Sequence, residues 1–130
     1  MIKRCFFIML ILAAFAGIMV FFACGRQKVH CVTGINNLDH YYILEFENMN
    51  REDSCMIPVC KDDIFAVNFR IDKGCVDFII GIDGKSPIYK GNDIESGVFD
   101  VIAPEDGEYR ITVKAKHASG YGEVYAKKGE

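Results

Sequence analysis

The stretch "EYRITVKAK" at residues 108–116 carries the clearest repeating pattern in this sequence. Apolar and polar residues alternate along it, with a charged or hydroxyl-bearing residue at every second position. Successive side chains of a β-strand point to opposite faces, so this period of two predicts a strand with one buried and one solvated face. The predicted buried face consists of Tyr109, Ile111, Val113 and Ala115. Because Tyr109 lies just after the turn "APEDG" (103–107), we expect its hydroxyl to reach loop backbone.

The same alternation extends upstream and downstream of this stretch. "DIFAVNFRID" (63–72) and "CVDFIIGI" (75–82) show it strongly, and "YYILEFEN" (41–48), "GVFDVIA" (97–103) and "GYGEVYAK" (120–127) show it more weakly. The residues predicted to face inward from the two strong segments are Phe65, Val67, Phe69, Ile71, Val76, Phe78, Ile80 and Ile82.

Turn signals separate these segments. "DKG" at 72–74 and "DG" at 83–84 and 106–107 are typical of tight turns, and "ASGYG" at 118–122 is expected to divide the last two strands. No helical periodicity follows the N-terminal apolar run. Six to seven short strands predict an all-β fold, a small antiparallel β-sandwich spanning residues 40–127.

The N-terminus predicts export. After Lys3 and Arg4, the nineteen residues from Cys5 to Ala23 carry no charge. A short cationic start before an apolar run is typical of a secretory signal. The run is also just long enough to span a bilayer, which takes roughly 18–20 residues.

The end of that run, "FFACG" at 21–25, resembles the lipobox of bacterial lipoproteins. Ala23 and Cys24 match the pattern, whereas Phe21 stands where the family usually has leucine. The resemblance implies a signal peptide at 1–23, a lipidated Cys24 as the new N-terminus, and a linker at 24–39. The protein would then be held on the extracytoplasmic face of the cell membrane. An uncleaved single-span anchor and ordinary cleavage to a free protein are the alternatives.

The C-terminal half carries a second resemblance. Residues 74–127, from "GCVDFII" to "GEVYAK", resemble the compact β-sandwich domain of small exported bacterial lipoproteins, and their spacing is similar to GOLD-type and pre-peptidase-type domains. The resemblance covers residues 40–127 and rests on hydrophobic positions and turns. It implies a binding or adaptor module, although a fold by itself does not determine a function.

The charge of the predicted domain argues against nucleic acid as a partner. Of the 15 basic residues two precede the apolar run, which leaves 13 against 18 acidic residues. A nucleic-acid-binding domain needs a basic face to neutralise phosphates.

Four cysteines follow Cys24, namely Cys31, Cys55, Cys60 and Cys75. In an exported domain two disulfides are the default expectation, with three possible connectivities, and we expect at least one. The alternative is that some of these cysteines are small hydrophobic residues or free thiols. If residues 54–60 form a strand, Cys55 and Cys60 lie about 16 Å apart and cannot pair with each other. Cys75 points away from the core face of its strand.

No catalytic, metal or cofactor site is predicted. "GIDGKS" (81–86) lacks the first glycine of a phosphate-binding loop, because Ile79 occupies that position, so we interpret it as a turn. The spacing of His30, Cys31, His40, Cys55 and Cys60 matches no zinc template.

The tyrosines are the predicted binding surface. Tyr41, Tyr89, Tyr121 and Tyr125 fall at strand ends or on faces not needed for the core. An exposed tyrosine offers contact area at low entropic cost, which suits carbohydrate or protein partners. Alternatively these rings cover the second sheet or hydrogen-bond across strand ends. The sequence therefore predicts an exported, lipid-anchored β-sandwich with a non-enzymatic binding role, and the alternative is a thiol-redox or metal-binding envelope protein using the surplus cysteines.

Overall fold

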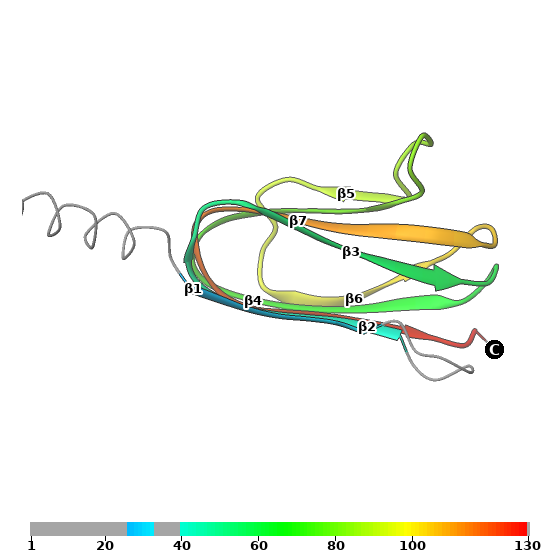
Figure 1. Cartoon of the computed structure of the whole chain (residues 1–130), viewed down its shortest axis with the longest axis horizontal. Coiled ribbons are helices and arrows are strands. Elements are labelled where there is room, and N and C mark those ends of the chain that lie inside the picture. Colours follow the sequence, from blue (N-terminus) through cyan, green and yellow to red (C-terminus); the bar gives the residue numbers. More distant parts are fainter. Residues whose placement is uncertain (1–25, 33–39, 130) are drawn as a thin grey trace, which may run out of the picture.

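The structure, a computed structural model, describes residues 26–32 and 40–129 (Figure 1). Regular secondary structure in these residues is entirely β-strand, as predicted. The strands are β1 (Arg26–Val32), β2 (His40–Met49), β3 (Glu52–Val59), β4 (Ile64–Gly81), β5 (Tyr89–Gly91), β6 (Gly97–Ile102) and β7 (Gly107–Lys127).

These strands form two layers that face each other, lower and upper in Figure 1. The first layer has the order β1-β2-β7-β4-β6, and the second has the order β3-β7-β4-β5. All of the pairings are antiparallel. Strands β4 and β7 appear in both layers because each is long enough to run through one layer, bend, and continue in the other. The predicted β-sandwich is therefore confirmed, as a sheet folded over on itself.

The bend, at the left of Figure 1, depends on glycines. The pairing of β4 with β7 shifts register between Ile71 and Cys75, which marks a β-bulge. Gly74 there has a φ of +80°, and a Cβ atom on it would collide with the carbonyl oxygen of His117 on β7. A Cβ on Gly120 would likewise collide with the carbonyl oxygen of Arg70. The two backbones can cross the bend this closely only because these residues lack side chains.

This bend corrects two sequence predictions. We expected "DKG" (72–74) and "ASGYG" (118–122) to be turns that end strands, but both lie inside continuous strands. A glycine-containing bulge and a tight turn need the same residues, so the local sequence does not distinguish them. The segments 63–72 and 75–82 thus belong to one strand, and so do 108–116 and 120–127.

Strand β1 lies within the segment 24–39 that was expected to be a linker. Residues 26–32 pair with β2 over their whole length, from Arg26 opposite Glu47 to Val32 opposite Tyr41. Val29 packs against the core. The folded part of the chain therefore begins well before residue 40.

The core lies between the two layers. Every residue predicted to face inward is buried except Ile71 and Ile82, which are half-buried where the chain leaves the core. The largest fully buried side chains include Tyr42, Tyr109, Phe65, Phe78 and Leu44.

In residues 26–32 and 40–129 there is no helix long and apolar enough to cross a membrane. The predicted signal or anchor helix and Cys24 lie outside the described residues.

Candidate functional site

Two of the predicted tyrosines lie side by side on the outer face of the first layer. Tyr41 on β2 is directly opposite Tyr125 on β7 in the strand register, and their ring centroids are 5.6 Å apart at a tilt of 33°. Tyr41 is half-buried, whereas Tyr125 keeps 37% of its surface exposed. The pair therefore presents aromatic surface to solvent in a fixed arrangement.

Tyr121 belongs to the same face, because it stands four residues before Tyr125 on the same strand. Its hydroxyl donates a hydrogen bond to Oε2 of Glu123 at 2.7 Å, and Nδ2 of Asn68 on β4 donates to Oε1 of Glu123 at 3.3 Å. The bond to Glu123 raises the pKa of Tyr121 to about 12, so its phenol keeps its proton above pH 10. Glu123 is thus held by two neighbours in the middle of the face.

The register extends this face across four strands. Ala66 on β4 lies beside Tyr125, and Asn68 lies beside Glu123. On the neighbouring edge strand β6, Asp100 lies beside Ala66 and Val98 beside Asn68. Val98 is the most exposed large hydrophobic residue of the described chain at 75%. We call Tyr41, Tyr121, Glu123, Tyr125, Ala66 and Asn68 the tyrosine face.

Tyr89 is not part of the tyrosine face. It lies on β5 in the second layer, and its ring packs against the core, with centroids 4.9 Å from Phe99 and 5.7 Å from Phe78. A Cβ atom on Gly91 would lie 2.7 Å from the Tyr89 hydroxyl, so this glycine leaves the space that the ring occupies. Tyr89 stands at a strand end, as the first residue of β5, but its ring packs against the core.

Two other tyrosines are interior. Tyr109 is fully buried and donates a hydrogen bond to the carbonyl oxygen of Glu105 at 2.8 Å, which confirms the predicted contact with loop backbone. Tyr42 is 1% exposed and donates to Oδ2 of Asp53 at 2.5 Å, which links the first layer to β3 of the second. Burial, with the bond to Asp53, raises the pKa of Tyr42 well above its usual value.

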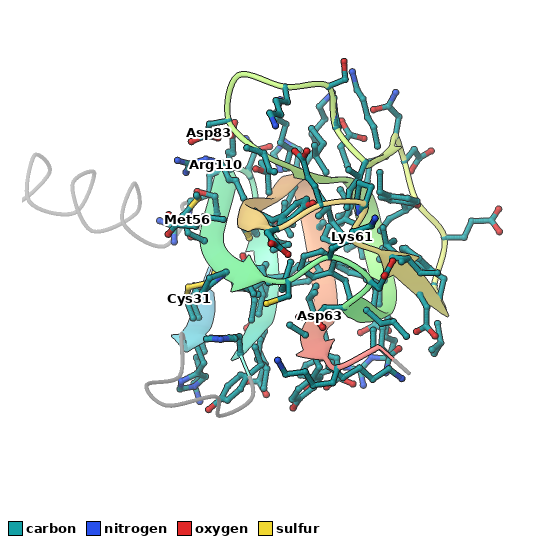
Figure 2. All side chains as sticks on the ribbon, turned by 90° about the vertical axis from the view of Figure 1, so that its right-hand side faces the viewer. Cys31, Met56, Lys61, Asp63, Asp83 and Arg110 are labelled. Atoms are coloured by element: carbon teal, nitrogen blue, oxygen red, sulfur yellow. A yellow bond between two sulfur atoms is a disulfide. The ribbon has the colours of Figure 1, made fainter. Side chains whose placement is uncertain are left out.

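Cys31 and Cys55 form a disulfide. It joins β1 of the first layer to β3 of the second, so it ties the two layers together along one edge; Cys31 is labelled on that side of the sandwich in Figure 2. The prediction of at least one disulfide is confirmed, whereas the second disulfide expected by default does not form, because Cys60 and Cys75 are free.

The other two described cysteines are free and exposed. Cys60 follows β3, where its backbone N–H donates to Oδ2 of Asp63, and Cys75 lies at the bend of β4. A hydrogen bond with Asp93 raises the pKa of the Cys75 thiol. A redox nucleophile needs the opposite shift, because the thiolate is the reactive form.

The histidines and cysteines considered as metal ligands do not come together. Two of the five candidates are consumed by the disulfide. In residues 26–32 and 40–129 no group of three or more His, Cys, Asp or Glu side chains is placed to hold a metal ion.

A second surface feature escaped sequence reasoning. A shallow depression of about 200 Å³ lies on the second layer, with Ile79 and Thr112 among its lining residues and the turn Ile82–Pro87 at its side. "GIDGKS" forms this turn, as predicted, with the N–H of Lys85 donating to the carbonyl oxygen of Ile82. Only proximity in the fold, not spacing in the sequence, reveals the depression.

The charged groups at this depression are already paired. Arg110 donates two hydrogen bonds to Asp83, each of 2.9 Å, and Lys85 contacts Glu105 at 2.6 Å. Figure 2 shows Asp83 and Arg110 together at the open end of the sandwich. Arg110 lowers the pKa of Asp83, which keeps the pair charged and mutually neutralised.

No family model matches this sequence, and no curated protein matches it either. Among solved structures, the chain is similar to one titled "CBM4 structure and function", with 11% identity, a TM-score of 0.39, and 80% of this chain and 76% of that chain covered. It is also similar to the Cnp3 cupin domain of Schizosaccharomyces pombe, with 17% identity, a TM-score of 0.39, and 78% and 65% covered.

A third similar structure is PliG of Aeromonas hydrophila, a periplasmic inhibitor of g-type lysozyme. The identity is 12%, the TM-score is 0.38, and the alignment covers 82% of this chain and 88% of that chain. Similarity at this level says nothing about what this chain binds.

Proposed function

We propose that this protein is an exported, lipid-anchored, non-enzymatic binding protein, and that the tyrosine face is its binding surface. The observation that carries the proposal is the arrangement of Tyr41, Tyr121 and Tyr125 on one outer sheet face, with Glu123 held among them by two hydrogen bonds. Aromatic residues with a polar group are the side chains that binding surfaces use most, because they combine area with directional contacts. Here they are held in place by the sheet, so binding costs little ordering entropy.

The position of β1 is compatible with an anchor at Cys24. Strand β1 begins at Arg26, which pairs with Glu47 close to the bend. A lipid on Cys24 would therefore hold the bent end of the sandwich near the bilayer and direct the open end away from it. The tyrosine face, on the side of the sandwich, would stay accessible to a partner.

Fractionation of cells tests the anchor. We expect Cys24→Ala to remain as an unprocessed precursor or to leave the membrane fraction, whereas Cys75→Ala, which removes an exposed thiol of the folded domain, should fractionate like the parent. If Cys24→Ala migrates and fractionates like the parent, the lipid anchor is wrong and the uncleaved span is favoured.

Photocrosslinking in the producing cells tests the binding surface. A photoreactive amino acid in place of Tyr125 should give a higher-mass adduct, because this ring is the most exposed of the three on the tyrosine face. The same group at Lys114, an exposed position on the second layer, is the matched control and should give none. Equal labelling at both positions, or none at either, contradicts the proposal.

Thiol-redox or metal chemistry is less well supported. The exposed Cys75 has its pKa raised rather than lowered, and Cys31 and Cys55 are bonded to each other in a position that joins the two layers. A disulfide that joins the two layers stabilises the fold.

A further inference from the structure

We propose that the tyrosine face binds a neutral carbohydrate chain. The inference rests on the proposed function, since it takes this face as the binding surface and specifies the class of its partner. Three features at adjacent positions of one sheet face support it. They are the exposed ring of Tyr125, its small neighbour Ala66, and the hydrogen-bonded group of Tyr121, Glu123 and Asn68.

The ring of Tyr125 is available for stacking. Its 37% exposure is high for a ring on a paired central strand, and it arises because the neighbour on β4 is Ala66, whose methyl group leaves the space next to the ring open. On the other side, Tyr41 contacts Tyr125 and fixes its orientation. A pyranose ring has an apolar C–H face of similar size, and it can lie over Ala66 against this aromatic surface.

The hydrogen-bonding cluster lies in the next row of the sheet. An ionised carboxylate has about four lone-pair sites, and Glu123 uses one for Tyr121 and one for Asn68. Asn68 keeps a second N–H and its carbonyl oxygen, and the Tyr121 hydroxyl keeps its acceptor sites. A ligand with several hydroxyl groups can use donors and acceptors together, which matches the rim of a sugar ring.

Charge near the exposed ring favours a neutral sugar over a polyanion. The sheet face carries both signs, with Glu45, Glu123 and Asp100 on one hand and Lys28 opposite Glu45 and Arg70 beside Tyr121 on the other. Arg70 is paired with Asp72 at 3.4 Å. Glu123, two residues from Tyr125 on the same strand, would repel a phosphate, sulfate or uronate group placed on that ring.

Glu123 also favours a sugar over a protein partner. The centres of protein interfaces are depleted of charged residues, because a buried carboxylate must be fully paired. Glu123 has two partners and open acceptor sites, and it lies at the middle of the face rather than at its rim. A glycan supplies hydroxyl donors to those sites and leaves part of the carboxylate hydrated.

The test uses the full-length protein in detergent and two kinds of probe. The first is delipidated envelope from the producing cells, fixed on beads and treated with either protease or periodate, which destroys sugar diols. The second is a panel of neutral polysaccharides whose sugars keep vicinal hydroxyl groups, namely 4-linked glucans, mannan, xylan and galactan. We expect retention that survives protease, is lost after periodate, and changes little between about 0.05 M and 0.5 M salt.

Variants locate the binding on the tyrosine face. Tyr125→Ala should weaken retention about tenfold or more, Tyr125→Phe should keep most of it, and Glu123→Gln should weaken it several-fold because a hydrogen bond to a charged acceptor is lost. Lys90→Ala, on the second layer, should bind like the parent. Thermal melts of each variant check that it is folded under the conditions of the binding assay.

The outcomes separate this inference from the proposed function. Retention that survives periodate and is lost after protease, with the same dependence on Tyr125, identifies a protein partner; it overturns the carbohydrate inference and leaves the binding surface intact. No retention on the treated envelope or on any neutral polysaccharide, together with crosslinking at Tyr125 in cells, also overturns the inference alone. Absence of both retention and crosslinking overturns both proposals.

Discussion

The two sides of strand β7 in the first layer are built from different kinds of residue. Its inner side carries Gly122, Val124 and Ala126, all buried, whereas its outer side carries Tyr121, Glu123 and Tyr125. A Cβ atom on Gly122 would lie 2.5 Å from the ring of Phe69, so the small inner residue is required by packing.

No such packing requirement explains the outer side. The rings of Tyr41 and Tyr125 contact each other and solvent, and Glu123 is placed by hydrogen bonds rather than by the core. The inner side of the sheet therefore determines stability, and the outer side is available for binding.

The largest effect should come from Phe78, in the centre of the interior. Its ring is fully buried and contacts the rings of Phe69, Tyr89 and Phe99. Phe78→Ala should lower the free energy of unfolding by about 3–5 kcal/mol, because it removes buried surface and leaves a cavity. Urea denaturation measures the change, and a variant as stable as the parent would place the core elsewhere.

Removal of the disulfide should have the next largest effect. The bond closes a loop with a sequence separation of 24 residues and holds β1 to β3. The double change Cys31→Ala, Cys55→Ala should cost about 3 kcal/mol, since the unfolded chain gains conformational freedom. Loss of stability on adding reductant to the parent, but not to the double variant, assigns the effect to this bond.

Alkaline pH should reveal the buried hydroxyl of Tyr42. Tyr42 keeps its proton in the folded state well above pH 10, whereas in the unfolded chain it ionises near that pH. The folded state therefore binds more protons, and its stability must fall as pH rises above 10, by up to about 1.4 kcal/mol per pH unit for this group. Melts at pH 9 and pH 11 should show a steeper loss for the parent than for Tyr42→Phe, and parallel losses would contradict the assignment.

A smaller effect is expected from Tyr109→Phe. The ring stays in the core and only the hydrogen bond to the carbonyl oxygen of Glu105 is lost. Thermal melts should show a destabilisation of about 0.5–1.5 kcal/mol. A loss as large as that of Phe78→Ala would mean that this loop contact is essential to the fold.

Much of this fold could be predicted because its pattern is local. Alternation along 108–116 and 63–72 identifies both the strands and their buried faces without knowledge of what they pair with. The bulges at Gly74 and Gly120 could not be predicted, because whether a glycine ends a strand or bends it depends on the strand packed against it. Strand β1 was missed because only Val29 and Cys31 among its described side chains follow an apolar alternation.

The candidate site was partly predictable. Strand parity places Tyr41, Tyr121 and Tyr125 on one face once β2 and β7 are known to pair. That pairing is a property of the fold and cannot be seen in the local sequence. Tyr89 turned inward because Gly91 makes room for it, and Glu123 and Asn68 meet although they are 55 residues apart. Contacts of this kind, like the bond between Cys31 and Cys55, are set by topology. The lipid anchor at Cys24 stays a prediction.

Tyr125→Ala tests the division between the two sides most directly, with stability and binding measured on the same preparation. Because its ring lies on an open face, against Tyr41 and beside the small Ala66, the free energy of unfolding should change by less than about 0.5 kcal/mol. Retention on protease-treated envelope or on the bound neutral polysaccharide should meanwhile fall about tenfold. A variant that unfolds like Phe78→Ala while its folded fraction binds as the parent does would show that the outer side serves stability, and the tyrosine face would not be the binding surface.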